Sequence, residues 1–94
     1  MADQQPHQIQ INDSIPGGGE YSNWAHIGHS KEEFRITFAN IMNPSGKVTS
    51  KIITTPSQFK SIVMAMTENL KMYEKSFGEI TEAKQTDAEI GFKG

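Results

Sequence analysis

Apolar residues recur at helical spacing along the stretch from Thr55 to Gly78. Successive apolar positions lie three, one, three, four, three and four residues apart, which places seven side chains on one stripe of an α-helix. These residues are Phe59, Ile62, Val63, Met66, Leu70, Tyr73 and Phe77. Thr55 is a favourable N-cap, Pro56 suits the first helical position, and Gln58 can complete a capping box. Gly78 is a typical helix end. The pattern therefore predicts one long helix over 56–77, with the stripe buried.

A period of two replaces the helical spacing in the middle of the chain, as expected for strands. In the clearest alternation, Arg35 and Thr37 alternate with the apolar residues Phe34, Ile36 and Phe38. This alternation predicts a strand with one apolar and one polar face.

The segment 21–28 mixes aromatic and branched residues, which favours an earlier strand. Alternation along this segment places Trp24 and His26 on one face. The opposite face carries Tyr21, Ala25 and Ile27.

A third strand is indicated between a turn and the helix. Asn43–Gly46 has the Pro and Gly placement of a tight reversal, and the β-branched Val48, Ile52 and Ile53 follow it. Short connections favour an antiparallel order of the strands. The predicted fold class is therefore α+β: a three-stranded antiparallel meander followed by one long amphipathic helix packed across one face.

The two ends of the chain differ in composition from this core. Residues 1–20 are rich in Gln and end in a Gly17–Gly19 run, so they are predicted to form a flexible N-terminal arm. Ile9 and Ile11 alternate with polar residues, which would let the arm add to a sheet edge when a partner is present. The core domain is predicted over 21–78, and 79–94 is predicted to be a flexible C-terminal tail.

Composition narrows the functional classes without selecting one. The 94 residues carry a formal charge of −2, which gives no global electrostatic reason for nucleic-acid binding. There are no cysteines, so a disulfide framework and a thiolate metal site are excluded. The start MADQQPHQIQ has neither the basic nor the apolar segment of a signal, and no window reaches the roughly 20 apolar residues of a bilayer span. We expect a cytoplasmic protein with no membrane association.

Residues that could carry catalysis do not converge at any spacing in the sequence. His26 and His29 are three residues apart, which points them to opposite faces of a strand and makes them poor joint metal ligands. Glu68 and Glu74 lie six residues apart on the predicted helix, and no serine has a nucleophile-elbow context. The sequence therefore predicts no enzyme, no catalytic or metal site and no cofactor.

Trp24, His26 and Arg35 are candidates for partner binding on the outward strand face. Together with Lys47 and Lys51 they could also form a basic aromatic surface of the kind that binds single-stranded nucleic acid. One tryptophan and a few scattered cations are fewer than such binders usually show, and Trp24 could also belong to the core. Core, protein interface and nucleic-acid surface stay open for this residue.

The predicted helix suggests self-association. At about 33 Å it is longer than a strand of about 26 Å, so its C-terminal half should extend past a three-stranded sheet. A core of this small size also buries only about 60% of its unfolded surface. We therefore expect a homodimer with a two-fold interface. The candidate interface residues are Met66, Leu70, Tyr73 and Phe77.

Four short motifs occur in a fixed order over residues 21–80. They are Tyr21–Trp24 (Tyr-Ser-Asn-Trp), His29–Phe38 (His-Ser-x-Glu-Glu-Phe-Arg-x-x-Phe), Pro56 at the helix start, and Tyr73–Gly78 (Tyr-Glu-Lys-x-Phe-Gly). In these motifs the chain resembles the bacterial domain-of-unknown-function family numbered 3467. Its pattern runs Tyr-x-Asn, Ser-x-x-Glu-Phe, a reversal, a basic strand, a Ser/Thr-Pro helix start and Tyr-Glu-x-x-Phe-Gly.

The resemblance implies a partner and no catalytic residues. Genes of that family in Bacteroides-like bacteria often lie close to the gene of the β′ subunit of RNA polymerase, which implies a transcription partner. The first functional hypothesis is a non-enzymatic protein-interaction module, homodimeric or associated with RNA polymerase. It is supported by the absence of a catalytic constellation, the small core and the two tails. The alternative is a small nucleic-acid-binding module that uses the Trp24, Arg35 and Lys51 strand face, and the salt dependence of binding separates the two.

Overall fold

The computed structural model describes residues 8–83 and 90–92. The chain divides into two compact units, Met1–Ile53 and Thr54–Gly94. The outer parts of the predicted arm and tail, residues 1–7, 84–89 and 93–94, lie outside the described residues.

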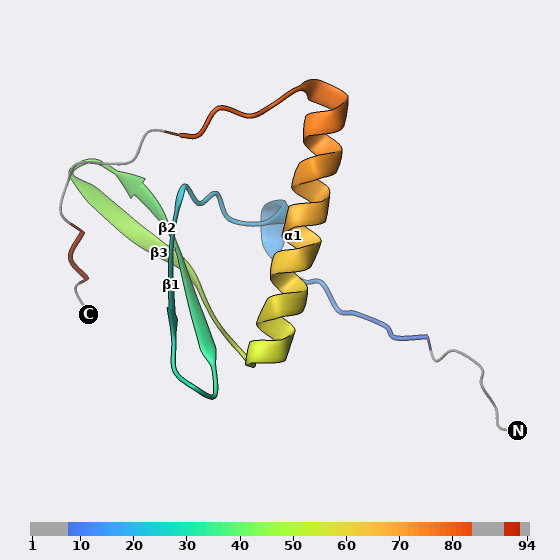
Figure 1. Ribbon diagram of the computed structural model, residues 1–94. Helices are drawn as coiled ribbons and strands as arrows, with labels where there is room; N and C mark the ends of the chain where they lie inside the picture. The colour runs from blue at the N-terminus through green and yellow to red at the C-terminus, as the bar shows by residue number, and fades with distance from the viewer. Residues whose placement is uncertain (1–7, 84–89, 93–94) are drawn as a thin grey trace, which may run out of the picture. The chain divides into compact units, whose positions relative to one another are not determined.

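The first unit contains a three-stranded sheet (Figure 1). Its strands are β1 (Trp24–His29), β2 (Phe34–Met42) and β3 (Ser45–Thr54), in the spatial order β1-β2-β3. β1 and β2 are antiparallel, and the Asn43–Pro44 turn, whose peptide bond is cis, leads directly from β2 into β3. The predicted antiparallel meander is therefore confirmed, with β2 at its centre.

The register between β1 and β2 defines the two faces of the sheet. On one face, Trp24 pairs with Ala39, His26 with Thr37 and Gly28 with Arg35. On the other face, Ala25 pairs with Phe38, Ile27 with Ile36 and His29 with Phe34. These pairs confirm the predicted separation of the polar from the apolar set.

The buried apolar residues of the described chain both lie in the central strand. Ile36 is 6% exposed and Ala39 is 5% exposed, and they belong to opposite faces of the sheet. The edge strands have less cover, because Ile27 in β1 and Ile53 in β3 are more than half exposed. The core of this unit is consequently small.

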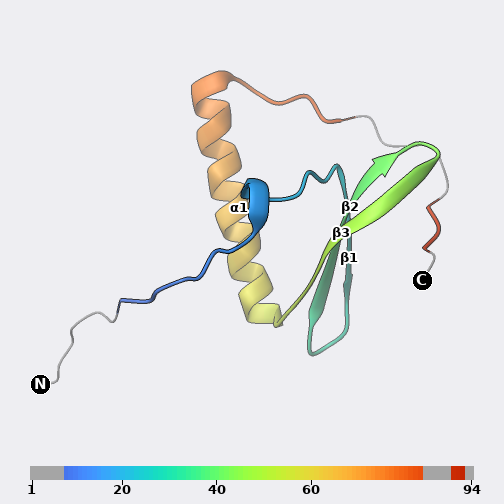
Figure 2. The ribbon, with the colours of Figure 1, turned by 180° about the vertical axis from the view of Figure 1, so that it is seen from behind.

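The second unit is built on one helix, α1 (Pro56–Phe77), seen as an unbroken coil in Figure 2. Thr55 Oγ1 accepts a hydrogen bond from the Gln58 N–H at 3.3 Å, so the predicted N-cap is confirmed. At the other end, the Gly78 N–H donates to the Glu74 carbonyl at 2.9 Å, with φ at 97°. This positive φ is readily adopted by glycine and ends the helix at the predicted residue.

The prediction that the helical stripe is buried is wrong for the chain as the structure describes it. α1 contains no buried residue, and the exposed fractions are 56% for Met66, 49% for Leu70, 49% for Tyr73 and 75% for Phe77. A single helix cannot cover its own stripe, and the neighbouring segment 78–83 is short and has no regular structure. The packing of α1 across a face of the sheet stays a prediction.

The described part of the N-terminal arm adds one short element, the 3₁₀ turn η1 (Pro16–Gly18). Ile9 and Ile11 are 80% and 85% exposed. Gly17, Gly18 and Gly19 all have positive φ, which side chains with a Cβ rarely adopt. The run therefore redirects the backbone between the arm and the sheet.

We predict that Thr55→Ala lowers the free energy of unfolding by about 1 kcal/mol, because the Gln58 N–H loses its acceptor at the start of α1. The measurement is urea denaturation followed by circular dichroism at 222 nm. Ser57→Ala, an exposed position in the first turn, is the matched control. Equal stability of the two variants would show that the cap contributes nothing.

Candidate functional site

Trp24 and His26 form one continuous aromatic surface on the first face of the sheet. Their rings are nearly parallel, with an interplanar angle of 14° and centroids 6.1 Å apart. The opposing residues on β2, Ala39 and Thr37, have small side chains. The two rings therefore project beyond the side chains of the neighbouring strand. Trp24 is partly buried, and His26 is exposed.

Arg35 completes this surface one residue pair further along. It lies opposite Gly28, and a Cβ at Gly28 would be 3.8 Å from His26 Cε1, so the imidazole leans along β1 toward that glycine. Arg35 Nε donates to Glu33 Oε2 at 2.6 Å, in an ion pair whose arginine side chain is 66% exposed. The sheet thus brings together the three predicted residues Trp24, His26 and Arg35, with Glu33 as a fourth. We call this set the aromatic–basic face.

The two lysines of the nucleic-acid hypothesis are less closely tied to this face. Lys47 Nζ lies 3.6 Å from Glu20 Oε1, so its charge is partly balanced. Lys51 is exposed on the edge strand β3. Arg35 and Lys47 each lie next to a carboxylate. This neighbouring negative charge lowers their attraction for phosphate.

Asn23 holds the start of this surface in place, a role that sequence reasoning missed. Its Nδ2 donates to the Ile41 carbonyl at 3.0 Å, and its Oδ1 accepts from the Ile41 N–H at 2.8 Å. Its own backbone N–H donates to the Ala39 carbonyl at 3.0 Å. The side-chain amide thus continues the hydrogen-bond ladder between β1 and β2 by one step. It pairs with both the backbone N–H and the carbonyl of Ile41. The only sequence signal for this residue was its place in the Tyr-x-Asn motif.

A second polar link precedes the same strand. The hydroxyl groups of Ser22 and Thr49 form a hydrogen bond, which joins the chain before β1 to β3. Together with Asn23, this contact fixes the entry of the chain into β1 immediately before Trp24.

The other predicted residues, Met66, Leu70, Tyr73 and Phe77, follow each other along one side of α1. The rings of Tyr73 and Phe77 are 5.0 Å apart at an angle of 47°. This tilted arrangement is a favourable aromatic geometry, so the pair forms a preformed apolar surface at the C-terminal end of the helix.

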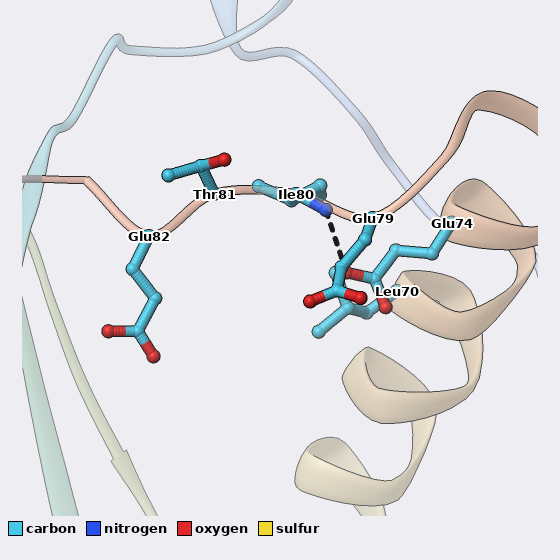
Figure 3. Close-up of a pocket in the computed structure, with 6 residues that line it drawn as sticks. All are labelled: Leu70, Glu74, Glu79, Ile80, Thr81 and Glu82. Carbon is cyan, nitrogen blue, oxygen red and sulfur yellow. Dashed lines mark hydrogen bonds between the residues drawn. The ribbon is translucent and has the colours of Figure 1, made fainter.

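An acidic hollow lies beside the same end of α1. It is lined by Leu70, Glu74, Glu79, Ile80, Thr81 and Glu82 (Figure 3). Glu74 Oε2 accepts a hydrogen bond from the Ile80 N–H at 3.0 Å, which ties the segment after Gly78 back to the helix. The three carboxylates give the hollow a negative charge, and Leu70 and Ile80 add apolar side chains to its lining.

These arrangements do not include the elements of a metal or membrane site. Within residues 8–83 and 90–92, no group of three or more potential metal ligands was found. In the same part of the chain, no helix combines the length and the apolar character that crossing a bilayer requires. The candidate site therefore consists of two surfaces, the aromatic–basic face and the exposed stripe of α1.

Comparison with known proteins gives a family for this chain. The family model described as a protein of unknown function (DUF3467) matches residues 1–82. The chain therefore belongs to this family, as the motif resemblance predicted, and the match also includes the N-terminal arm. No similar curated protein and no similar solved structure was found.

We predict that Asn23→Ala lowers the free energy of unfolding by roughly 1–2 kcal/mol, because two hydrogen bonds to Ile41 are lost. Asn23→Asp should cost at least as much at pH 7, since a carboxylate oxygen then faces the Ile41 carbonyl. Urea denaturation measures both changes, with Asn12→Ala in the exposed arm as the control. A loss within about 0.5 kcal/mol, the range of ordinary surface substitutions, would contradict this role.

Proposed function

We propose that this chain is a non-enzymatic protein-interaction module that forms a homodimer through α1. The observation that supports this most strongly is the exposure of four large apolar side chains on one side of a capped, regular helix. They are Met66, Leu70, Tyr73 and Phe77, at exposed fractions from 49% to 75%. Leaving such a continuous stripe in water forgoes about 25 cal/mol per Å² of apolar area, so burial by another protein is favourable.

The aromatic–basic face is the second contact surface in this proposal. Aromatic residues and arginine are enriched at the energetically dominant positions of protein interfaces, and here they occur together on a rigid sheet. The Arg35–Glu33 pair at the edge provides both charges for a polar rim. β1 is moreover an edge strand, so the N-terminal arm or a partner strand can extend the sheet beside Trp24.

RNA polymerase is the partner that we propose for this face. The support is the gene proximity to the β′ subunit that the resemblance to this family implies, and it does not come from the geometry of the site. A cytoplasmic location belongs to the same proposal.

Nucleic-acid binding is the second candidate function. The register that places Trp24, His26 and Arg35 on one face favours it, because stacked rings beside a guanidinium can accept unpaired bases. The ion pairs of Arg35 and Lys47 and the formal charge of −2 weigh against it. Protein binding therefore remains the preferred function.

We predict that Trp24→Ala and His26→Ala each reduce binding of the full chain to purified core RNA polymerase by at least tenfold, because a central aromatic anchor contributes about 2 kcal/mol or more. Biolayer interferometry measures the affinity. Lys31→Ala, at an exposed position between β1 and β2, is the control, and thermal melting reports whether each variant is folded. Equal binding by folded variants would exclude this face as the polymerase contact.

Salt dependence tests the second candidate against the first. Trp24 is the only tryptophan, so its fluorescence reports directly on this face. The proposed function predicts little change in this fluorescence when a single-stranded oligonucleotide is added. Strong quenching with a logarithmic salt slope of about −0.7 for each phosphate contacted would instead favour the nucleic-acid function.

A further inference from the structure

Six of the seven stripe residues of α1 follow the spacing of a coiled coil. They are Phe59, Val63, Met66, Leu70, Tyr73 and Phe77, separated by alternating steps of four and three residues. This is the a/d pattern of the heptad repeat, with Val63, Leu70 and Phe77 at a and the others at d. We call these six residues the seam. The seam has two apolar positions in each heptad, and a stripe this narrow suits pairing with one other helix.

We propose that a second copy of this chain covers the seam, and that the two α1 helices pair antiparallel around a two-fold axis close to Glu68. This inference rests on the proposed function in taking α1 as the surface of a homodimer. It adds the orientation and the register of the homodimer interface.

The seam residues form complementary layers in this register. In an antiparallel pair, an a residue of one helix faces a d residue of the other. Phe77 then faces Phe59 of the second copy, Tyr73 faces Val63, and Leu70 faces Met66. The terminal layer contains two phenylalanines, and each of the other layers joins a larger side chain to a smaller or more flexible one. The two-fold axis makes each layer occur twice.

The charges beside the seam select the antiparallel orientation. The flanking e positions are Lys60, Thr67 and Glu74, and in this register Lys60 of one copy lies beside Glu74 of the other. Lys60 also lies near the C-terminal end of the opposite helix, where a cation is favourable. In a parallel pair, Lys60 would lie beside Thr55 and Glu74 beside Asn69, and neither contact joins opposite charges.

The acidic hollow strengthens this complementarity. Glu74 belongs to its lining together with Glu79 and Glu82, and the Ile80 N–H occupies one oxygen of Glu74. The other carboxylate oxygen is not part of that bond (Figure 3). Lys60 of the second copy thus approaches Glu74 in a region to which the segment after Gly78 adds two further carboxylates. The hydrogen bond between the Ile80 N–H and Glu74 would thereby hold this segment next to the interface.

The apolar area is sufficient for a specific dimer. An aromatic side chain buries about 200 Å², so Tyr73 and Phe77, at 49% and 75% exposure, offer about 250 Å² per chain. Two copies then supply about 500 Å² from these residues alone, half of the roughly 1,000 Å² that a specific interface requires. Val63, Met66 and Leu70 are 41%, 56% and 49% exposed and supply much of the remainder.

A charge exchange tests this register. Lys60→Glu and Glu74→Lys should each weaken the dimer of the full chain about tenfold in sedimentation equilibrium, because each creates two like-charge pairs. The double variant with both substitutions should restore most of the affinity. Residues 60 and 74 are too far apart on one helix to pair with each other, so the restoration has to come from the second copy. Lys71→Glu makes the same charge change at a position that does not flank the seam, and it should leave the dimer unchanged.

A distance measurement gives an independent test of the orientation. The chain has no native cysteine, so Ser57→Cys provides a single site for a nitroxide spin label. The proposed register places the two labels about 33 Å apart along the helix axes. A parallel pair would bring them within about 10–20 Å of each other, and this distance would overturn the proposal.

The outcomes distinguish this inference from the proposed function. A wild-type chain that is monomeric at about 100 µM would overturn the antiparallel dimer and, with it, the homodimer of the proposed function. The seam would then be covered by the sheet of its own chain or by a different protein. Polymerase binding that depends on Trp24 would then still support the broader function. A dimer in which the charge exchange restores nothing would overturn the register.

Discussion

The exposed apolar stripe of α1 is the feature on which the rest of this account depends. Thr55 and Gly78 fix the ends of the helix, so the stripe residues are held on one side along its whole length. The same local interactions cannot remove those residues from water, because neighbouring side chains on one helix cover each other only partly. A helix of this kind gains most of its stability from whatever packs on its apolar face. The need for a covering surface follows directly.

The sheet has a comparable limitation. Ile36 and Ala39 are buried in the central strand, while the edge strands keep large apolar residues exposed. Hydrogen bonds provide part of the stabilisation that a larger core would give. At the entry to β1, Asn23 is hydrogen-bonded to Ile41 and Ser22 to Thr49. These links hold Trp24 and His26 in a defined position. A small surface whose side chains are held in place by hydrogen bonds is suited to recognition.

Much of the fold could be predicted from the sequence because its signals are local. The cap at Thr55, the glycine stop at Gly78 and the alternation around Ile36 each depend on a few neighbouring residues, and the structure has them as expected. The grouping of Trp24, His26 and Arg35 also followed from strand alternation. The exposure of the helical stripe could not be predicted, because periodicity shows which side chains share a face and gives no information on what covers that face. The two hydrogen bonds of the Asn23 side chain depend on Ile41, a partner 18 residues away that no local pattern reveals.

Methionine oxidation at increasing protein concentration tests the central claim most directly. Met66 belongs to the seam, whereas Met64 and Met72 lie on other sides of the same helix, and all three are between 56% and 62% exposed. If a second copy covers the seam, peroxide should oxidise Met66 progressively more slowly as the concentration rises, while the rates at Met64 and Met72 stay constant. Equal rates at all three methionines, independent of concentration, would contradict the account.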